Sequence, residues 1–108
     1  MEKIPWFKFY TCFFKRQSIV IINNLRNSEA IILTLIKLLC MATEINDRGY
    51  VYITPERPYK TKELASYMGK SVKVMENILL VLQEYGEIEV EKNGMIFVTP
   101  TTIAIKAE

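Results

Sequence analysis

Apolar residues in the first half of the chain recur at every third or fourth position, a spacing that predicts amphipathic helices. Over residues 29–45 this spacing predicts a long central helix that Ser28 caps. A shorter helix is predicted over residues 17–25, although its β-branched run is ambiguous on local grounds. Alternating apolar and polar residues over 50–53 predict a strand, and the prolines over 54–58 predict a loop after it.

The second half of the chain predicts two helices joined by a tight turn. Thr61 is placed to cap a helix over residues 62–68, and a glycine turn over 69–70 follows. Ser71 is placed to cap a further helix that ends near Tyr85. The positions expected to point inward from these two helices are Leu64, Ala65, Met68, Val72, Met75, Ile78, Leu79 and Leu82.

A hairpin is predicted after these helices, with alternating strands over 88–91 and 95–98. The Asn93-Gly94 pair between them predicts a two-residue turn with positive φ at both positions. Pro100 is expected to end the hairpin, and residues 101–108 predict no regular element.

This order of helix, turn, helix and hairpin is typical of an α+β fold, the winged helix-turn-helix. Such a fold is mainly helical and has a small antiparallel β-sheet. We expect a single domain over residues 1–108. It would comprise an aromatic N-terminal arm or strand over 1–14, a helix-turn-helix over 60–85 and a wing hairpin over 87–98.

Composition bounds the possible functions. The chain has 108 residues, and half of them are apolar. This is enough for one hydrophobic core that does not need disulfides or a metal ion to be stable. It contains no histidine, and Cys12 and Cys40 have no metal-ligand spacing, so a Cys/His zinc site within one chain is excluded. Both cysteines have apolar neighbours, and we expect buried thiols in a reducing compartment.

No signal peptide or membrane span is predicted. The first residues lack an apolar segment with a cleavage site. The longest apolar run, residues 30–42, contains Lys37 and is too short to cross a bilayer. We therefore expect a cytoplasmic protein without a membrane partner.

Charge is distributed unevenly, although the net charge is only +2. Residues 1–28 carry five basic residues against one acidic residue, and residues 60–73 carry four lysines against one glutamate. Residues 76–91 carry five glutamates and no basic residue, and these glutamates are expected on solvent faces or strands. Positive charge is thus concentrated on the N-terminal segment and at the start of the helix-turn-helix.

This pattern predicts binding to double-stranded DNA. The second helix of a helix-turn-helix presents its N-terminal residues to base edges, where lysine bonds guanine, asparagine bonds adenine and valine packs on a thymine methyl. The residues placed to approach bases are Lys70, Ser71, Lys73, Val74 and Asn77. Those placed to contact the DNA backbone are Lys60, Thr61 and Lys62 at the preceding helix start, and Lys92 and Asn93 at the hairpin turn.

A protein-binding role is the alternative. The aromatic segment and an apolar outer helix face beside the glutamates suit a protein partner or a homodimer better than a phosphate backbone. The residues that would form this surface are Trp6, Phe7, Phe9 and Tyr10 in the arm, and Leu80 and Val81 on the last helix. The same aromatics could also stack on single-stranded bases, or form a core strand.

An enzyme is not predicted, and no catalytic residue, cofactor or metal site is assigned. The chain has no histidine and no glycine-rich phosphate loop, and its carboxylates show no acid–base pairing.

The ordered set of motifs resembles the N-terminal domain of phage replisome organiser proteins, a family close to DnaD-like primosomal domains. The matching segments are Trp6-Phe7-Lys8, Phe13-Phe14, the helix over 29–45, and residues 46–53, 58–65 and 81–90. The resemblance implies a winged-helix module in replication initiation of a phage or mobile element. Such a module would recognise origin DNA and recruit helicase-loading proteins. A transcriptional regulator would share the DNA-binding surface.

Overall fold

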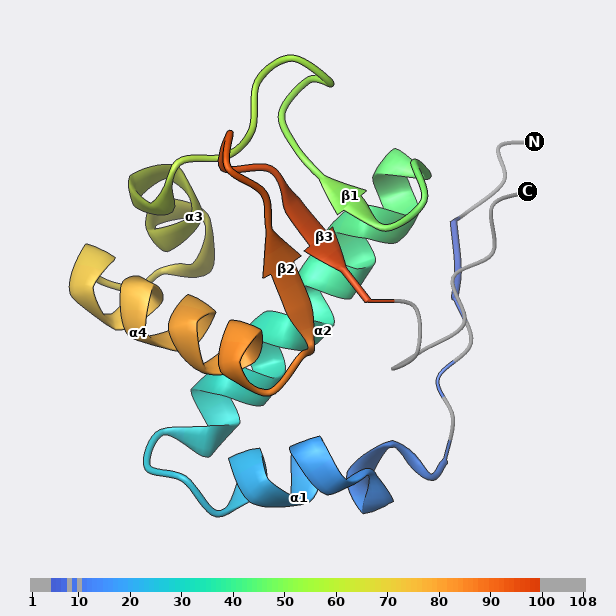
Figure 1. The fold of residues 1–108 in the computed structure, drawn as a ribbon, viewed down its shortest axis with the longest axis vertical. Helices are drawn as coiled ribbons and strands as arrows, with labels where there is room; N and C mark the ends of the chain where they lie inside the picture. Colours follow the sequence, from blue (N-terminus) through green and yellow to red (C-terminus); the bar gives the residue numbers. More distant parts are fainter. Residues whose placement is uncertain (1–4, 8, 10, 100–108) are drawn as a thin grey trace.

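The computed structural model describes residues 5–7, 9 and 11–99, which form four α-helices, one 3-10 turn and three short strands (Figure 1). The fold is α+β, mainly helical, with a small antiparallel sheet, as the sequence predicts. The elements are η1 (Phe13–Lys15), α1 (Gln17–Asn23), α2 (Ser28–Ile45), β1 (Tyr50–Val51), α3 (Thr61–Met68), α4 (Val72–Glu84), β2 (Ile88–Val90) and β3 (Ile96–Val98).

The sheet is antiparallel, and its strand order is β1-β3-β2. Tyr50 lies opposite Phe97 on the central strand, and Phe97 lies opposite Glu89. Helix α2 crosses behind the sheet, and α3 and α4 lie on the side of β2 (Figure 1). Helix α1 lies across the N-terminal end of α2. Strand β1 ends at Val51 and is shorter than the strand predicted over 50–53. After it the chain turns back, and Thr54 pairs with Arg57 in an isolated bridge.

Helix α2 is the centre of the core, as its apolar spacing predicts. Its inward side chains meet those of α1, α4 and the sheet, and each fully buried Leu, Ile or Met contributes roughly 1.5–3 kcal/mol of transfer free energy. The largest fully buried side chains are Phe13, Ile19, Ile22, Ile31, Leu35, Leu38, Leu39, Leu64, Met75, Ile78, Leu82 and Ile88.

All but one of the inward positions predicted for α3 and α4 are buried. The exception is Val72, which is 42% exposed, so its assignment to the core was wrong. Val72 is the first residue of α4 and lies beyond the end of the packed helix face.

Two predicted helix caps are wrong by one residue, and the third is confirmed. Ser28 and Thr61 are the first residues of their helices, and the N-cap residues are Asn27 and Lys60. Asn27 has a positive φ of 66°, a conformation that asparagine tolerates better than most residues. Ser71 caps α4, since its Oγ accepts a hydrogen bond from the Val74 N–H at 3.2 Å.

The hairpin between β2 and β3 closes differently from the expected turn. Gly94 has a positive φ of 90°, whereas Asn93 is not among the residues with positive φ. The Gly94 N–H donates to the Glu91 carbonyl (2.8 Å), and the Glu91 N–H donates to the Met95 carbonyl (2.9 Å). The loop is thus one residue longer than a two-residue turn, with glycine alone taking the left-handed position.

The N-terminal segment is irregular where it is described. Residues 5–7 and 9 form no strand, and the Phe9 ring lies 4.9 Å from that of Phe13. The remaining predictions for Tyr10, Pro100 and residues 101–108 lie outside the described residues.

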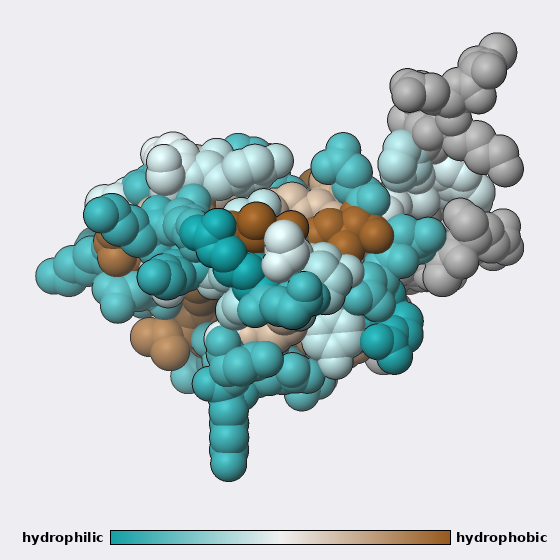
Figure 2. All heavy atoms as spheres, turned by 90° about the horizontal axis from the view of Figure 1, so that it is seen from above, coloured by the Kyte–Doolittle hydropathy of each residue, from teal (hydrophilic) through white to brown (hydrophobic). Residues whose placement is uncertain are grey.

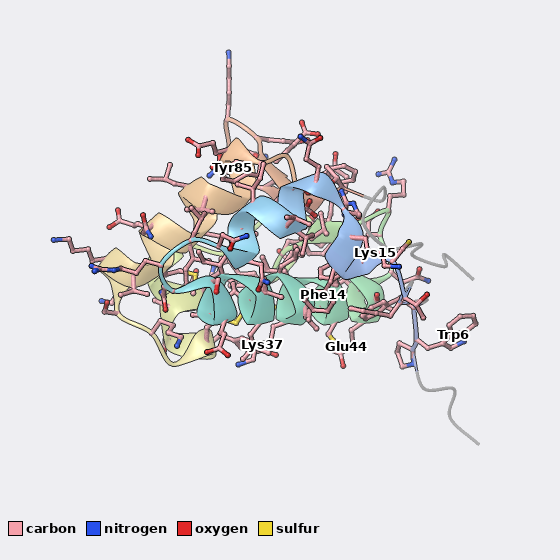
Figure 3. The ribbon with its side chains drawn as sticks, turned by 90° about the horizontal axis from the view of Figure 1, so that it is seen from below. Trp6, Phe14, Lys15, Lys37, Glu44 and Tyr85 are labelled. Carbon is pink, nitrogen blue, oxygen red and sulfur yellow. The ribbon has the colours of Figure 1, made fainter. Side chains whose placement is uncertain are left out.

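Both cysteines are exposed, which contradicts the predicted burial. Cys40 lies on the outer stripe of α2 with Lys37 and Glu44, which point away from the core (Figure 3). The apolar neighbours of Cys40 in sequence face the core on the other side of the same helix.

Candidate nucleic-acid interface

The turn between α3 and α4 is fixed by backbone conformation and a backbone hydrogen bond, and its side chains are accessible to solvent. Gly69 adopts the left-handed conformation (φ 69°), and the Lys70 N–H donates to the Ala65 carbonyl (2.8 Å). The Ser71 cap then starts α4 at the surface. The predicted base-reading residues Lys70, Ser71, Lys73, Val74 and Asn77 are all exposed. The N-terminal end of α4 is therefore not covered by another described element.

The outward stripe of α4 changes character along the helix. Lys73 and Asn77 lie opposite the buried stripe, and the same line continues to Leu80 and Glu84. Leu80 is 63% exposed, as predicted, whereas Val81 is half-buried and packs against the core. The polar, basic part of α4 is thus confined to its first two turns.

The start of α3 already holds a carboxylate. The Lys60 N–H donates to Glu63 Oε1 (2.9 Å), and Arg57 Nη2 lies 2.7 Å from Glu63 Oε2. The Lys60 N–H at the start of α3 therefore already donates to a carboxylate and is not available to a phosphate. The Lys60 and Lys62 side chains remain exposed, and Thr61 is half-buried.

The hairpin turn lies beside the start of α3 (Figure 1). A Cβ added to Gly94 would lie 3.8 Å from Pro58 Cγ, which shows how closely the turn approaches the loop before α3. Lys92 and Asn93 are exposed there, although the Asn93 Oδ1 accepts a hydrogen bond from the Met95 N–H (3.0 Å). The turn thus brings Lys92 to the same side of the molecule as α3, while the Asn93 carbonyl oxygen holds the turn.

A shallow apolar hollow of about 270 Å³ separates the hairpin from α3 and α4. Viewed from above, the surface is mostly hydrophilic, with apolar side chains reaching it in separate places (Figure 2). The residues that line the hollow are Thr61, Glu76, Leu79, Leu80, Gln83, Val90, Gly94 and Ile96.

Glu87 is fully buried and precedes β2, which contradicts the prediction that it lies on a solvent face or a strand. Its carboxylate accepts hydrogen bonds from Arg16 Nη1 (3.3 Å) and from the Ser18 hydroxyl, and Arg16 Nη2 lies 3.2 Å from Oε2. The acidic run after α4 is therefore not one repulsive surface. Arg16 is likewise engaged within the fold, and the N-terminal segment presents less free positive charge than its sequence predicts.

Glu89 and Glu91 lie at the opposite side of the sheet from the hollow. Glu91 accepts a hydrogen bond from the Tyr50 hydroxyl (3.0 Å), and this bond raises the pKa of Tyr50. Nearby, the Tyr52 hydroxyl donates to Asp47 Oδ2 (2.8 Å) and holds the pKa of that carboxyl below its usual value. Glu91 and Asp47 are thus each partnered by a tyrosine.

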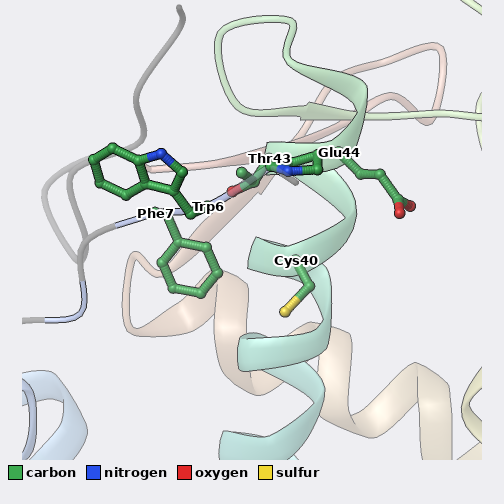
Figure 4. A pocket seen from close by; sticks show the side chains of 6 residues that line it. Trp6, Phe7, Cys40, Thr43 and Glu44 are labelled. Atoms are coloured by element: carbon green, nitrogen blue, oxygen red, sulfur yellow. The ribbon is translucent and has the colours of Figure 1, made fainter. Parts of the chain in front are cut away.

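The aromatic arm has an exposed and a packed part. Trp6 is 57% exposed and Phe9 is 44% exposed, whereas Phe7 is half-buried against the core. Trp6 and Phe7 lie over a hollow of about 380 Å³ against Cys40 and the end of α2 (Figure 4). Tyr10, the remaining predicted partner-binding residue of the arm, lies outside the described residues.

Within the described ranges, no helix has the length and apolar character needed to cross a membrane. No group of three or more potential metal ligands is found in that part of the chain.

These features define a small α+β protein whose helix–turn–helix junction presents lysines to solvent. The family model of the N-terminal phage replisome organiser matches residues 6–106. The chain belongs to this family, which indicates a role related to phage replication. No curated protein and no solved structure shows a significant match to the chain.

Proposed function

We propose that this chain is a winged-helix module that binds duplex DNA at a replication origin of a phage or mobile element. The order of α3, α4 and the β2–β3 hairpin, with β1 added to the hairpin as a third strand, supports the winged-helix assignment. The proposed site of action is the cytoplasm, where the replicating DNA lies.

The observation that carries this proposal is the exposed N-terminal end of α4. Its first two turns present Lys73, Val74 and Asn77, and Lys70 and Ser71 precede them at the surface. The lysine, serine and asparagine side chains can bond phosphates or base edges, the valine can pack on a thymine methyl, and a helix fits the major groove. Lys60, Lys62 and Lys92 supply backbone contacts on either side.

The test is the salt dependence of duplex binding in the variant Lys70→Gln/Lys73→Gln. Each lost phosphate contact makes the negative slope of log K against log salt shallower by roughly one, so we expect the slope to become shallower by up to about two if both lysines contact phosphates. The matched control is Lys15→Gln/Lys37→Gln, which removes the same charge from η1 and α2 (Figure 3). Equal slopes for the wild type and the α3–α4 variant would refute this surface.

A protein-binding role has its own supporting observation, the exposure of Trp6 and Phe9. An aromatic arm of this kind suits a second copy of the chain or a helicase-loading protein. Deletion of residues 1–14 would also remove Phe13, which is fully buried, so point variants are the better test. If the arm mediates a homodimer, sedimentation will show self-association that Trp6→Ala/Phe9→Ala abolishes. A monomeric wild type would exclude it.

A further inference from the structure

We propose that α4 reads consecutive A·T base pairs, with Asn77 bonding adenine and Val74 packing on a neighbouring thymine methyl. This inference rests on the proposed DNA binding and specifies the base composition that the surface recognises. It combines the placement of these two side chains with the exposure of Val74.

Val74 and Asn77 form a pair on the helix surface. Residues three apart on a helix have Cβ atoms about 5–6 Å apart, so their side chains can reach neighbouring base pairs. Both side chains are exposed, and within the described structure the Asn77 amide makes no hydrogen bond. An asparagine amide in this state can bond the N6 and N7 positions of adenine at once.

The exposure of Val74 favours thymine. Val74 is 37% exposed, although it is a β-branched apolar residue that would gain free energy on burial. A thymine methyl is the apolar group that the major groove offers. Contact with it would remove valine surface from water, and a G·C pair offers no methyl group there.

The side chains of α4 do not favour guanine or cytosine at its centre. Arginine and lysine are the residues that most often bond guanine, and Lys73 is the one such residue in 72–84. Glu76, which could accept from cytosine, lines the hollow toward the hairpin and lies off the Val74–Asn77 edge. Lys70 and Lys73 precede the pair and can bond phosphates or guanine, so guanine is expected beside the A·T step rather than within it.

The test begins with selection of bound sites from random duplexes and continues with base analogues. Deoxyuridine in place of thymine removes one methyl group, and 7-deazaadenine removes the N7 acceptor. For the wild type, deoxyuridine at one or two positions should weaken binding roughly fourfold, as expected for one buried methyl. 7-Deazaadenine at a neighbouring position should weaken binding by roughly tenfold.

Each analogue effect should vanish in one variant only. Val74→Ala should bind thymine and deoxyuridine sites equally, and Asn77→Ala should be insensitive to 7-deazaadenine. The control Val20→Ala removes a similarly exposed valine from α1 and should retain both effects. Duplex binding without sensitivity to either analogue, or selection of G·C pairs at these positions, would overturn this proposal and leave the DNA-binding role intact. Failure to bind any duplex at low salt would overturn the proposed function itself.

Discussion

The surface around the start of α4 and the junction where Glu87 meets Arg16 and Ser18 use similar residue types in opposite ways. At the junction, Arg16 and Ser18 from the N-terminal segment surround a carboxylate that is fully buried. At α4, Lys70 and Lys73 remain exposed. The comparison shows that local charge counts do not separate residues that hold the fold from residues that are available to a ligand.

The largest expected effect is at the junction. Glu87→Ala leaves Ser18 and Arg16 without their carboxylate partner. Removal of one member of a buried ion pair typically costs about 3–5 kcal/mol, and because the Arg16 side chain is 27% exposed we expect a loss near the lower end, about 3 kcal/mol. We expect urea unfolding to show a loss of this size. Glu87→Gln keeps an acceptor for Ser18 and should lose less. A cost below about 1 kcal/mol for Glu87→Ala would mean that the junction does not stabilise the fold.

A smaller effect is expected at the cap of α4. Ser71→Ala removes the acceptor for the Val74 N–H and should lower the free energy of unfolding by about 1 kcal/mol. Ser71→Gly is the matched comparison, because glycine at an N-cap costs only a few tenths of a kcal/mol relative to serine. A Ser71→Ala variant that is as stable as the wild type would show that the hydroxyl does not cap the helix.

The exposed lysines should contribute little to folding. Lys70→Gln/Lys73→Gln is expected to change the free energy of unfolding by less than about 0.5 kcal/mol, as is usual for surface positions. Chemical unfolding of the variant used for DNA binding measures this directly. A loss comparable to that of Glu87→Ala would erase the distinction between the two regions.

The smallest effect concerns Asp47, in the turn between α2 and β1. Its pKa is lowered from 3.8, mainly by the hydrogen bond from Tyr52. Because the folded-state pKa is below the unfolded value, the stabilisation is present above about pH 4 and is lost as pH falls through the folded pKa. An NMR titration should give a lower pKa for Asp47 in the wild type than for Asp47 in the Tyr52→Phe variant. Identical values would show that the hydrogen bond has no effect on titration.

The sequence predicts the helices and the hairpin well because their signals are local. The sequence alone shows the apolar spacing of α2 and α4. It also shows that Ser71 precedes an apolar run. The predicted caps at Ser28 and Thr61 miss by one residue, because each helix begins one residue earlier than predicted. Asn27 precedes α2 with a positive φ and without a side-chain cap hydrogen bond, and the N–H of Lys60, which precedes α3, donates to the Glu63 carboxylate.

The sequence could not predict features that depend on distant contacts. Glu87 stands among exposed glutamates, and Arg16 is 71 positions away, so only the folded chain shows that they meet. Cys40 has apolar neighbours along the chain but lies on the outer stripe of α2. The lysines that the sequence placed on the proposed DNA surface are exposed in the structure. The sequence did not predict that the Glu63 carboxylate occupies the start of α3.

The most direct test of DNA binding through α4 is an NMR titration of the labelled chain with a short duplex at low salt. We expect the largest backbone amide shifts at residues 70–77, with smaller shifts at 60–62 and 92–93. The amides of Ser18, Tyr50 and Glu87 should stay unchanged. Shifts concentrated on the aromatic arm or the outer face of the sheet, with α4 silent, would contradict the proposed surface.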